Sequence, residues 1–307
     1  MPNTILVVNQ HSRAIHIIDP DAATILATVT TPADRPHETV VTPDGRFAFC
    51  PIYGNAGVGK PGTDGRTVEI LDLATNTFVD SIDLGRPARP HCIRLAQDGL
   101  LYLTSEVARA VDIIDPASRK LLASISTGQD ESHMLVLTRD GKRAYTSNVC
   151  DGSISVLDLE RRELVTIIRI AKSIQRIAIS PDDRILYTTD QNFPRVAVID
   201  TQTSQVRDWI PLPSIGYATL VTPDGKFLLV TLLEASKLLQ IDLATNKIIN
   251  IMDVPAAPIA VMLDPRRTLA YVTCFSGGKA AIIDLENWNL LQLIDAGVGA
   301  DGLAWAK

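Results

Sequence analysis

At 307 residues, with 46% hydrophobic and 21% charged side chains, the chain has the composition of a globular protein and not of a disordered one. Its net charge of −6 and the lack of a Lys/Arg cluster exclude the electrostatic footprint of a nucleic-acid-binding protein. No segment has the length and apolarity of a membrane span or a signal peptide. We therefore expect no membrane partner and a cytoplasmic location, unless a leader has been removed.

From the N-terminus, the first expected elements are a strand over residues 4–9 and a strand of alternating apolar residues that ends in Asp. This alternating apolar run occurs seven times along the chain. Its last residues are Asp19, Asp72, Asp115, Asp158, Asp200, Asp242 and Asp284. Seven copies at nearly constant spacing predict a repeat architecture. Each Asp opens a polar turn, so we expect these side chains to hold turns and not to catalyse.

A second recurring motif places Pro-Asp-Gly or Pro-Asp-Asp between two β-rich runs. It occurs in residues 41–49, 179–187 and 221–229. It predicts a hairpin, because Pro presets φ and Gly accepts a positive φ. Each repeat then supplies four short strands, and no window shows the period of an amphipathic helix. The sequence therefore predicts an all-β fold, a seven-bladed β-propeller with four-stranded antiparallel blades, as a single domain over residues 1–307.

The longest connection expected within a repeat is the glycine-rich segment of residues 53–66, which explains why the first two aspartates are 53 positions apart. The segment follows a strand but opens no helix, so we expect no nucleotide cofactor. Strands alternate in direction, which places this loop on the face where the first strands of the blades begin. There it is either a lid over the channel or an ordinary surface elaboration.

The last expected element, residues 301–306, has the pattern of a first strand without a blade of its own. Pairing with the N-terminal strands would complete one blade from residues 1–30 and 299–307. Such pairing closes the ring and removes an open sheet edge.

The repeats resemble those of the YVTN β-propeller family, which is named for a Tyr-Val-Thr-Asn strand. That strand occurs here as Tyr271-Val-Thr-Cys274, Tyr145-Thr-Ser-Asn148, Tyr187-Thr-Thr-Asp190 and Tyr102-Leu-Thr-Ser105. The resemblance covers essentially the whole chain and implies the propeller fold. Propellers of this type include surface-layer proteins, lactonase-like enzymes and metal- or haem-bearing oxidoreductases, so the resemblance does not select a function.

One position per blade varies in a chemically informative way. It lies seven residues before the Asp of the Pro-Asp-Gly turn, or the equivalent residue, and is occupied by His37, His91, His133, Gln175, Tyr217, Ile259 and Asp301. The first strand of a propeller blade lines the channel, so these side chains should form a ring at its mouth. Three imidazoles beside a carboxylate form a ligand set for a divalent transition metal, Zn, Fe, Mn or Cu, with an open coordination position.

The predicted roles within this ring follow from those side chains. His37, His91 and His133 would hold the metal, and Asp301 would serve as general base or fourth ligand, while Gln175 and Tyr217 would position the substrate. Two other interpretations stay open. The ring is a polar plug around ordered water, or a metal-free binding or acid–base site.

Further side chains are expected on the same face as the ring. Those assigned to substrate binding are Glu38, Arg89, Arg176, Glu106, Asp190 and Phe193, and Arg35, Glu234 and Phe275 accompany them. The leading hypothesis is a metal-dependent enzyme for a small polar or cyclic substrate, by lactone-type hydrolysis or by lyase or isomerase chemistry. The alternative is a non-catalytic scaffold that binds a protein or a small ligand, and a redox enzyme is a third hypothesis.

Overall fold

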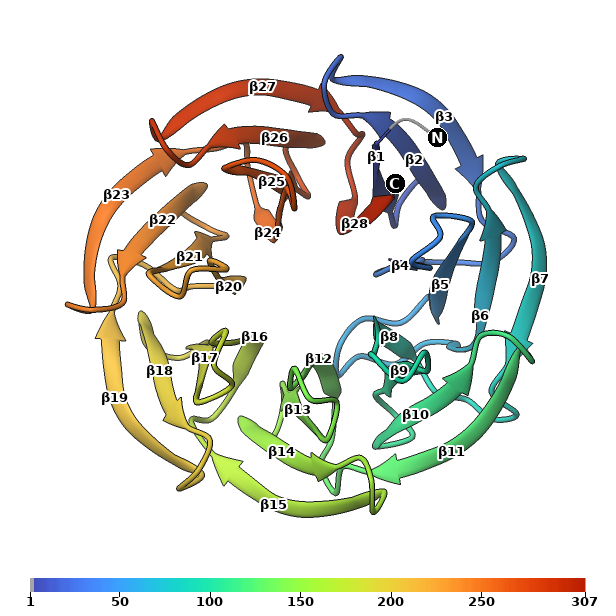
Figure 1. Ribbon diagram of the computed structural model, residues 1–307, viewed down its shortest axis with the longest axis horizontal. Helices are drawn as coiled ribbons and strands as arrows, with labels where there is room; N and C mark the ends of the chain where they lie inside the picture. The colour runs from blue at the N-terminus through green and yellow to red at the C-terminus, as the bar shows by residue number, and fades with distance from the viewer. Residues whose placement is uncertain (1–2, 307) are drawn as a thin grey trace.

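The structure is a computed structural model that describes residues 3–306. Within this range the chain forms 28 strands in seven four-stranded antiparallel sheets and no helix. Figure 1 shows the sheets as blades arranged around a central axis, with one strand of each nearest the axis. The prediction of a seven-bladed β-propeller is confirmed. No helix in the described range is long and apolar enough to cross a membrane.

The blades are numbered here from the one that contains the N-terminal strands, and each is given from its innermost to its outermost strand. Blade 1 comprises β28 (Ala300–Ala306), β1 (Thr4–Asn9), β2 (Ala14–Asp19) and β3 (Thr24–Thr30). Blade 2 comprises β4 (Val40–Val41), β5 (Phe47–Gly54), β6 (Asp64–Asp72) and β7 (Thr77–Asp83). Blade 3 comprises β8 (Pro90–Leu95), β9 (Leu101–Ser105), β10 (Ala110–Asp115) and β11 (Lys120–Ser126).

The remaining four blades follow the same order. Blade 4 comprises β12 (Ser132–Leu137), β13 (Arg143–Asn148), β14 (Ser153–Asp158) and β15 (Glu163–Arg169). Blade 5 comprises β16 (Ile174–Ile179), β17 (Ile185–Asp190), β18 (Arg195–Asp200) and β19 (Gln205–Pro211). Blade 6 comprises β20 (Thr219–Val221), β21 (Phe227–Leu232), β22 (Lys237–Asp242) and β23 (Lys247–Asp253). Blade 7 comprises β24 (Pro258–Leu263), β25 (Leu269–Cys274), β26 (Lys279–Asp284) and β27 (Asn289–Asp295).

The ring closes where the two ends of the chain meet. β28 pairs antiparallel with β1, and Val7 lies opposite Leu303 and Ile5 opposite Trp305. In Figure 1 the red C-terminal strand lies beside the blue N-terminal strands. The predicted closure by N-terminal strands plus a C-terminal strand is confirmed, although residues 1–2 and 307 of the predicted segments lie outside the described residues.

Burial explains why the strands have different patterns. The second and third strands of a blade pack against neighbouring blades on both faces, so β9 and β14 are almost completely buried. The outermost strands have one face in solvent, and β11 accordingly alternates between exposed and partly or fully buried residues. The core thus lies between blades and is built mainly from Val, Ile, Leu and Ala, which leaves the channel as the place where polar side chains converge.

The recurring aspartates hold turns, as predicted. The Oδ1 of Asp19 accepts the backbone N–H of Asp21 at 2.8 Å, and Oδ1 of Asp242 accepts that of Thr245 at 2.8 Å. Equivalent bonds form at Asp72, Asp115, Asp158, Asp200 and Asp284. The residue four positions after each Asp has a left-handed backbone conformation: Ala23, Asn76, Arg119, Arg162, Ser204, Asn246 and Trp288. These turns lie at the end of the third strands, on the face opposite the mouth.

Candidate functional site at the channel mouth

In five of the seven blades, a β-bulge directs the ring residue into the channel. In blade 4, Ser132 pairs with Asn148 and Met134 with Ser147, so His133 is the extra residue of the inner strand. The inner strands of blades 1, 3, 5 and 7 have a register shift at the same place. A bulge leaves one residue out of the hydrogen-bond ladder and changes the direction of its side chain. The sequence spacing located this position, but it did not predict the bulge.

Threonines of the Tyr-x-Thr strands fix the backbone of ring residues in the next blade. The hydroxyl of Thr104 donates to the carbonyl oxygen of His133 at 2.7 Å, and that of Thr273 donates to the carbonyl oxygen of Asp301 at 2.6 Å. Both threonines are completely buried. The residues that carry the family resemblance therefore also position the mouth.

The ring encloses a cavity of about 250 Å³. Its lining consists of Gln10, His37, Val58, His91, His133, Arg176, Tyr217, Leu233, Ile259, Phe275 and Asp301. Six of the seven ring positions are thus brought together around one space. Gln175, the seventh, is buried beside them with its Oε1 unpartnered, but it is not part of this lining.

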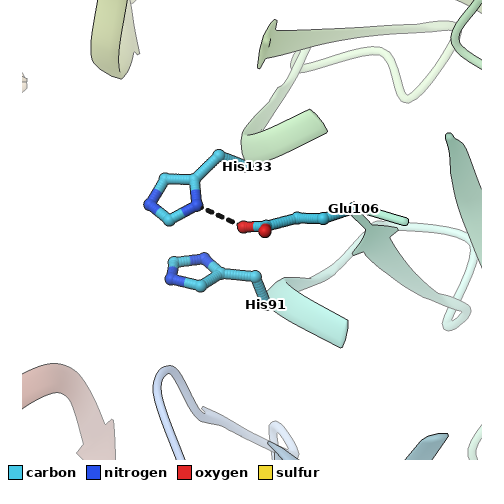
Figure 2. A group of neighbouring side chains, drawn as sticks. All are labelled: His91, Glu106 and His133. Carbon is cyan, nitrogen blue, oxygen red and sulfur yellow. Dashed lines mark hydrogen bonds and ion pairs between the residues drawn. The ribbon is translucent and has the colours of Figure 1, made fainter. Parts of the chain in front are cut away.

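His91, Glu106 and His133 form a candidate metal-binding triad. One ligand-type atom from each lies within 4.8 Å of the other two, and all three side chains are buried. The imidazoles of His91 and His133 stack with ring centres 3.7 Å apart, and Nδ1 of His133 is 2.5 Å from Oε1 of Glu106. Figure 2 shows the two rings one above the other, with the carboxylate at their edge. The Nδ1 of His91 is buried and has no hydrogen-bond partner.

Glu106 lies within a group of acidic and hydroxyl side chains. Its Oε2 accepts a hydrogen bond from the Tyr53 hydroxyl at 2.6 Å. Burial raises the pKa of Glu106, and burial together with the neighbouring Glu106 carboxyl raises the pKa of Glu131 to about 7. Two carboxyl groups in contact repel each other when both are ionised, and a cation bound beside them would relieve that repulsion.

The two stacked histidines are kept neutral. Burial, followed by the charges of His133 and His37, lowers the pKa of His91 well below its ordinary value. Burial and the charge of Arg176 lower the pKa of His133 to about 4. A neutral imidazole has the free lone pair that a metal ion requires.

His37 lies on the other side of His91 and is oriented by a different carboxylate. Its Nδ1 is 3.1 Å from Oδ2 of Asp301 and 3.0 Å from Nε2 of Gln10. Its Nε2 is buried and unpartnered. The ring centre of His37 is 4.7 Å from that of His91, but His37 does not belong to the triad. A carboxylate that fixes one ring nitrogen leaves the other available to bind or transfer a proton.

Arg176 crosses the channel from blade 5. One terminal nitrogen donates to Oε1 of Glu38 at 2.8 Å and the other to Oδ1 of Asp301 at 3.2 Å, in blades 2 and 1. Burial opposes its charge, yet these carboxylates outweigh burial and raise its pKa. Burial also opposes ionisation of Asp301, but His37 and Arg176 lower its pKa. Arg176 lines both the mouth cavity and a second cavity of about 210 Å³, so its side chain belongs to the walls of both.

The glycine-rich segment of residues 53–66, called the insertion below, lies over the mouth. The Arg89 guanidinium donates to the carbonyl oxygens of Lys60 at 2.8 Å and Gly57 at 3.3 Å, and to Oδ1 of Asp64 at 2.5 Å. Val58 is part of the cavity lining. Arg89, predicted to bind substrate, is therefore occupied in holding a covering loop.

Three further predicted residues occupy different environments. Tyr217 lines the cavity, and burial raises its pKa to about 12. Asp190 is completely buried and bonds to Arg195 at 2.9 Å. Phe193 is 61% exposed with the Arg195 guanidinium 5.1 Å from its ring centre. Neither Asp190 nor Phe193 lines the cavity.

Sequence reasoning did not single out several residues of the site. Tyr53 was recognised only as the first residue of the insertion, while Gln10, Glu131 and Leu233 were not considered. Glu131 carries the one available signal, since it stands two positions before a ring histidine. The contact of Tyr53 with Glu106 joins two blades and has no local sequence signature.

Comparison with known proteins supports the fold. A family model described as Cytochrome D1 heme domain matches residues 95–217, which is less than half of the chain. A chain from the structure of Kuenenia stuttgartiensis hydrazine synthase is similar with a TM-score of 0.80 and 18% identity, over 92% of each chain. A functionally unknown protein from Desulfotomaculum acetoxidans DSM 771 is similar with a TM-score of 0.80 and 11% identity, over 99% of each chain.

These similarities show the propeller fold and are compatible with the YVTN-type resemblance. No curated protein matches the sequence significantly.

Proposed function

We propose that this protein is a metal-dependent enzyme whose site is the channel mouth. His91, His133 and Glu106 would hold a divalent transition metal, Zn, Fe, Mn or Cu, and the cavity beside them would take a small polar or cyclic substrate. The observation that carries the proposal is the convergence of two buried neutral imidazoles and a buried carboxylate, with Nδ1 of His91 unpartnered. Leaving a buried polar nitrogen unpartnered costs free energy, which ligation of a metal would recover.

The chemistry of this donor set favours catalysis over a purely structural ion. Two histidines and one carboxylate are the protein ligands of catalytic zinc sites and of non-haem iron sites that keep open positions. When bound, such a metal supplies Lewis-acid activation of a substrate oxygen or of water. Tyr53, through its hydroxyl bond to Glu106, would fix the orientation of the carboxylate.

The chain's own residues would supply proton transfer and positioning. His37, oriented through Nδ1 by Asp301, would accept or donate a proton at Nε2. Tyr217 keeps its proton at neutral pH, since its pKa is about 12, and would donate a hydrogen bond to the substrate. Lactone-type hydrolysis, or lyase or isomerase chemistry, would use this arrangement.

Haem, which the description of the matching family names, does not fit the mouth as it is folded. The cavity of about 250 Å³ is below the range of about 300–1,000 Å³ that holds drug-sized ligands, and a haem macrocycle is not a small member of that class. The stacked imidazoles, with ring centres 3.7 Å apart, leave no space between them for its plane. A bare ion and a small substrate are compatible with the same space.

The first experiment measures metal per chain in protein purified without chelator or affinity metal. We expect about one equivalent of a transition metal in the parent, loss of it in His91→Ala and His133→Ala, and retention in His16→Ala, which removes a histidine outside the mouth. Glu106→Gln should weaken metal affinity by about 10-fold or more. Parent protein that neither contains metal nor takes it up from added ions would overturn the proposal.

A second comparison separates the ligands from the proton-transfer pair. His37→Ala should keep the metal and lose turnover of five- and six-membered lactones, whereas His91→Ala should lose both. If His37→Ala loses the metal while Glu106→Gln keeps it, the ligand set is instead the three histidines of the ring.

A non-catalytic scaffold stays the alternative function. The burial of the ring supports it, since buried polar residues can also fill a propeller channel without reacting. Metal binding without turnover of lactones, or of substrates for lyase and isomerase assays, would favour that alternative.

A further inference from the structure

The lining of the mouth cavity is divided by chemistry. Side chains from blades 1 to 5 are polar or charged, apart from Val58 of the insertion. Blades 6 and 7 contribute an apolar wall, defined here as Leu233, Ile259 and Phe275, next to the Tyr217 ring. Ile259 stands at the ring position that carries histidine in three other blades, so the apolar character belongs to the mouth and not to the repeat.

The apolar wall faces the triad. Each inner strand is adjacent to those of the blades before and after it, so the seven blades form a closed cycle. In a cycle of seven, blade 7 lies opposite blades 3 and 4. Figure 1 shows β24 across the ring from β8 and β12. Ile259, in β24, therefore lies across the cavity from His91 in β8 and His133 in β12.

The size of the cavity limits what can lie between these walls. Its volume of about 250 Å³ corresponds to roughly eight waters at about 30 Å³ each, which a ligand of about eight to ten non-hydrogen atoms would replace. A water molecule next to Leu233, Ile259 and Phe275 finds no hydrogen-bond partner among these side chains. An alkyl or ring carbon of a ligand is therefore favoured over water at this position.

We propose that the substrate is a small amphipathic molecule with an oxygen-bearing end at the His91–His133–Glu106 triad and a short hydrocarbon part on the apolar wall. Leu233, Ile259 and Phe275 then determine specificity by selecting the length of the hydrocarbon part. Val58 of the insertion also lines the cavity that would hold this substrate. This inference rests on the proposed function, because the triad must hold a metal to bind the oxygen-bearing end.

The test uses straight-chain alkyl hydroxamic acids, from acetohydroxamic to decanohydroxamic acid, as probes of the metal-loaded protein. Their head group binds metal ions, and only their hydrocarbon length changes along the series. Dissociation constants are measured by ligand-observed NMR. We expect affinity to rise by about fourfold per added methylene up to roughly the hexano compound, the change that corresponds to burying one CH₂, and then to fall as the cavity is filled.

Two leucine-to-alanine variants test whether the dependence of affinity on chain length arises at the apolar wall. Leu233→Ala should reduce affinity for hexanohydroxamic acid by at least about fourfold and leave acetohydroxamic acid unchanged. Leu291→Ala is the control, since Leu291 lies on outer strand β27 of blade 7 with 55% exposure. Ile259→Ala should move the preferred chain length upward, because it deepens the wall.

Failure of the inference and failure of the proposed function have different signatures. If the metal site is wrong, no hydroxamate binds at any length and metal analysis is negative, which overturns both. If only the wall is wrong, hydroxamates bind to the loaded protein with affinity independent of chain length, and Leu233→Ala equals Leu291→Ala. That result would overturn the inference and leave the metal site standing.

Discussion

The two faces of the propeller use carboxyl groups in opposite ways. On the face opposite the mouth, Asp115 and Asp242 accept hydrogen bonds within exposed turns. The pKa of Asp115 is lowered by the Ser118 hydroxyl and then by a backbone N–H, and that of Asp242 by the backbone N–H of Thr245. At the mouth, burial raises the pKa of Glu106 and Glu131. The ionised form is therefore stabilised in the turn aspartates and destabilised in Glu106 and Glu131, while Asp301 stays ionised at the mouth because His37 and Arg176 lower its pKa. Residues that repeat in every blade hold the fold, and residues at equivalent positions that differ between blades build the site.

The largest expected effect comes from removing the buried cation of the mouth. Arg176→Leu leaves Glu38 and Asp301 without their shared partner and should lower the free energy of unfolding by about 3–5 kcal/mol, measured by urea denaturation. Lys142→Leu removes the partner of Glu160 on the opposite face, where both side chains are exposed, and should change stability little. Equal losses in both variants would contradict the difference between the faces.

A smaller effect is expected from acidification of the metal-free protein. The pKa of His133 is 6.5 in an unfolded chain and about 4 in the fold. Between these values the unfolded chain binds a proton at this residue that the folded chain does not, so the contribution of His133 to stability decreases as the pH falls from 6.5 to 4. The loss is on the order of 3 kcal/mol for this group. His91, whose pKa is also lowered, adds to it in the same direction.

Glu106 and Glu131, whose folded-state pKa values are raised, act in the opposite direction over part of this range. The histidine contribution is therefore measured as the difference between two profiles of melting temperature against pH at constant ionic strength, and His133→Gln should lose less stability than the parent as the pH falls from 7 to 4. The turn aspartates act in another range. Their folded-state pKa values are lowered, so their contribution is present above the pKa of an unfolded Asp and is lost only as the pH falls further. Parallel profiles for the parent and His133→Gln would be inconsistent with a buried neutral His133.

The smallest effect concerns one turn among seven. Asp242→Ala removes an acceptor for the backbone N–H of Thr245 and should lower the melting temperature by no more than about 2–4 °C. Metal content should not change, because the turn lies on the face opposite the mouth. Loss of metal in this variant would show that the two faces are coupled.

The fold was accessible from sequence because it rests on local signals repeated seven times. The aspartates and Pro-Asp-Gly turns each carry a turn mechanism in a few residues, and their spacing alone predicts the blades. The ring of His37, His91 and His133 was accessible for the same reason, since the repeat defines which positions are equivalent. Closure by the two ends followed from the incomplete first blade.

The detailed site was less accessible, because its contacts cross between blades. Glu106 was expected on the correct face, but its contact with His133 depends on a bulge and on the packing of blade 3 against blade 4. Tyr53, near the end of β5, and Gln10, in the turn after β1, reach the ring from segments whose sequences carry no metal or acid–base signature. Arg89 was expected to face a substrate, and only the path of the insertion shows that it holds that loop.

The position of Arg176 also affects how small molecules would reach and leave the mouth cavity. It lines both the mouth cavity and the second cavity, and its guanidinium is held by carboxylates from two other blades. Passage from one cavity to the other would have to displace this buried cation from its partners, so we expect small molecules to enter and leave the mouth cavity by its own opening. A product that fits this cavity would then delay the next substrate.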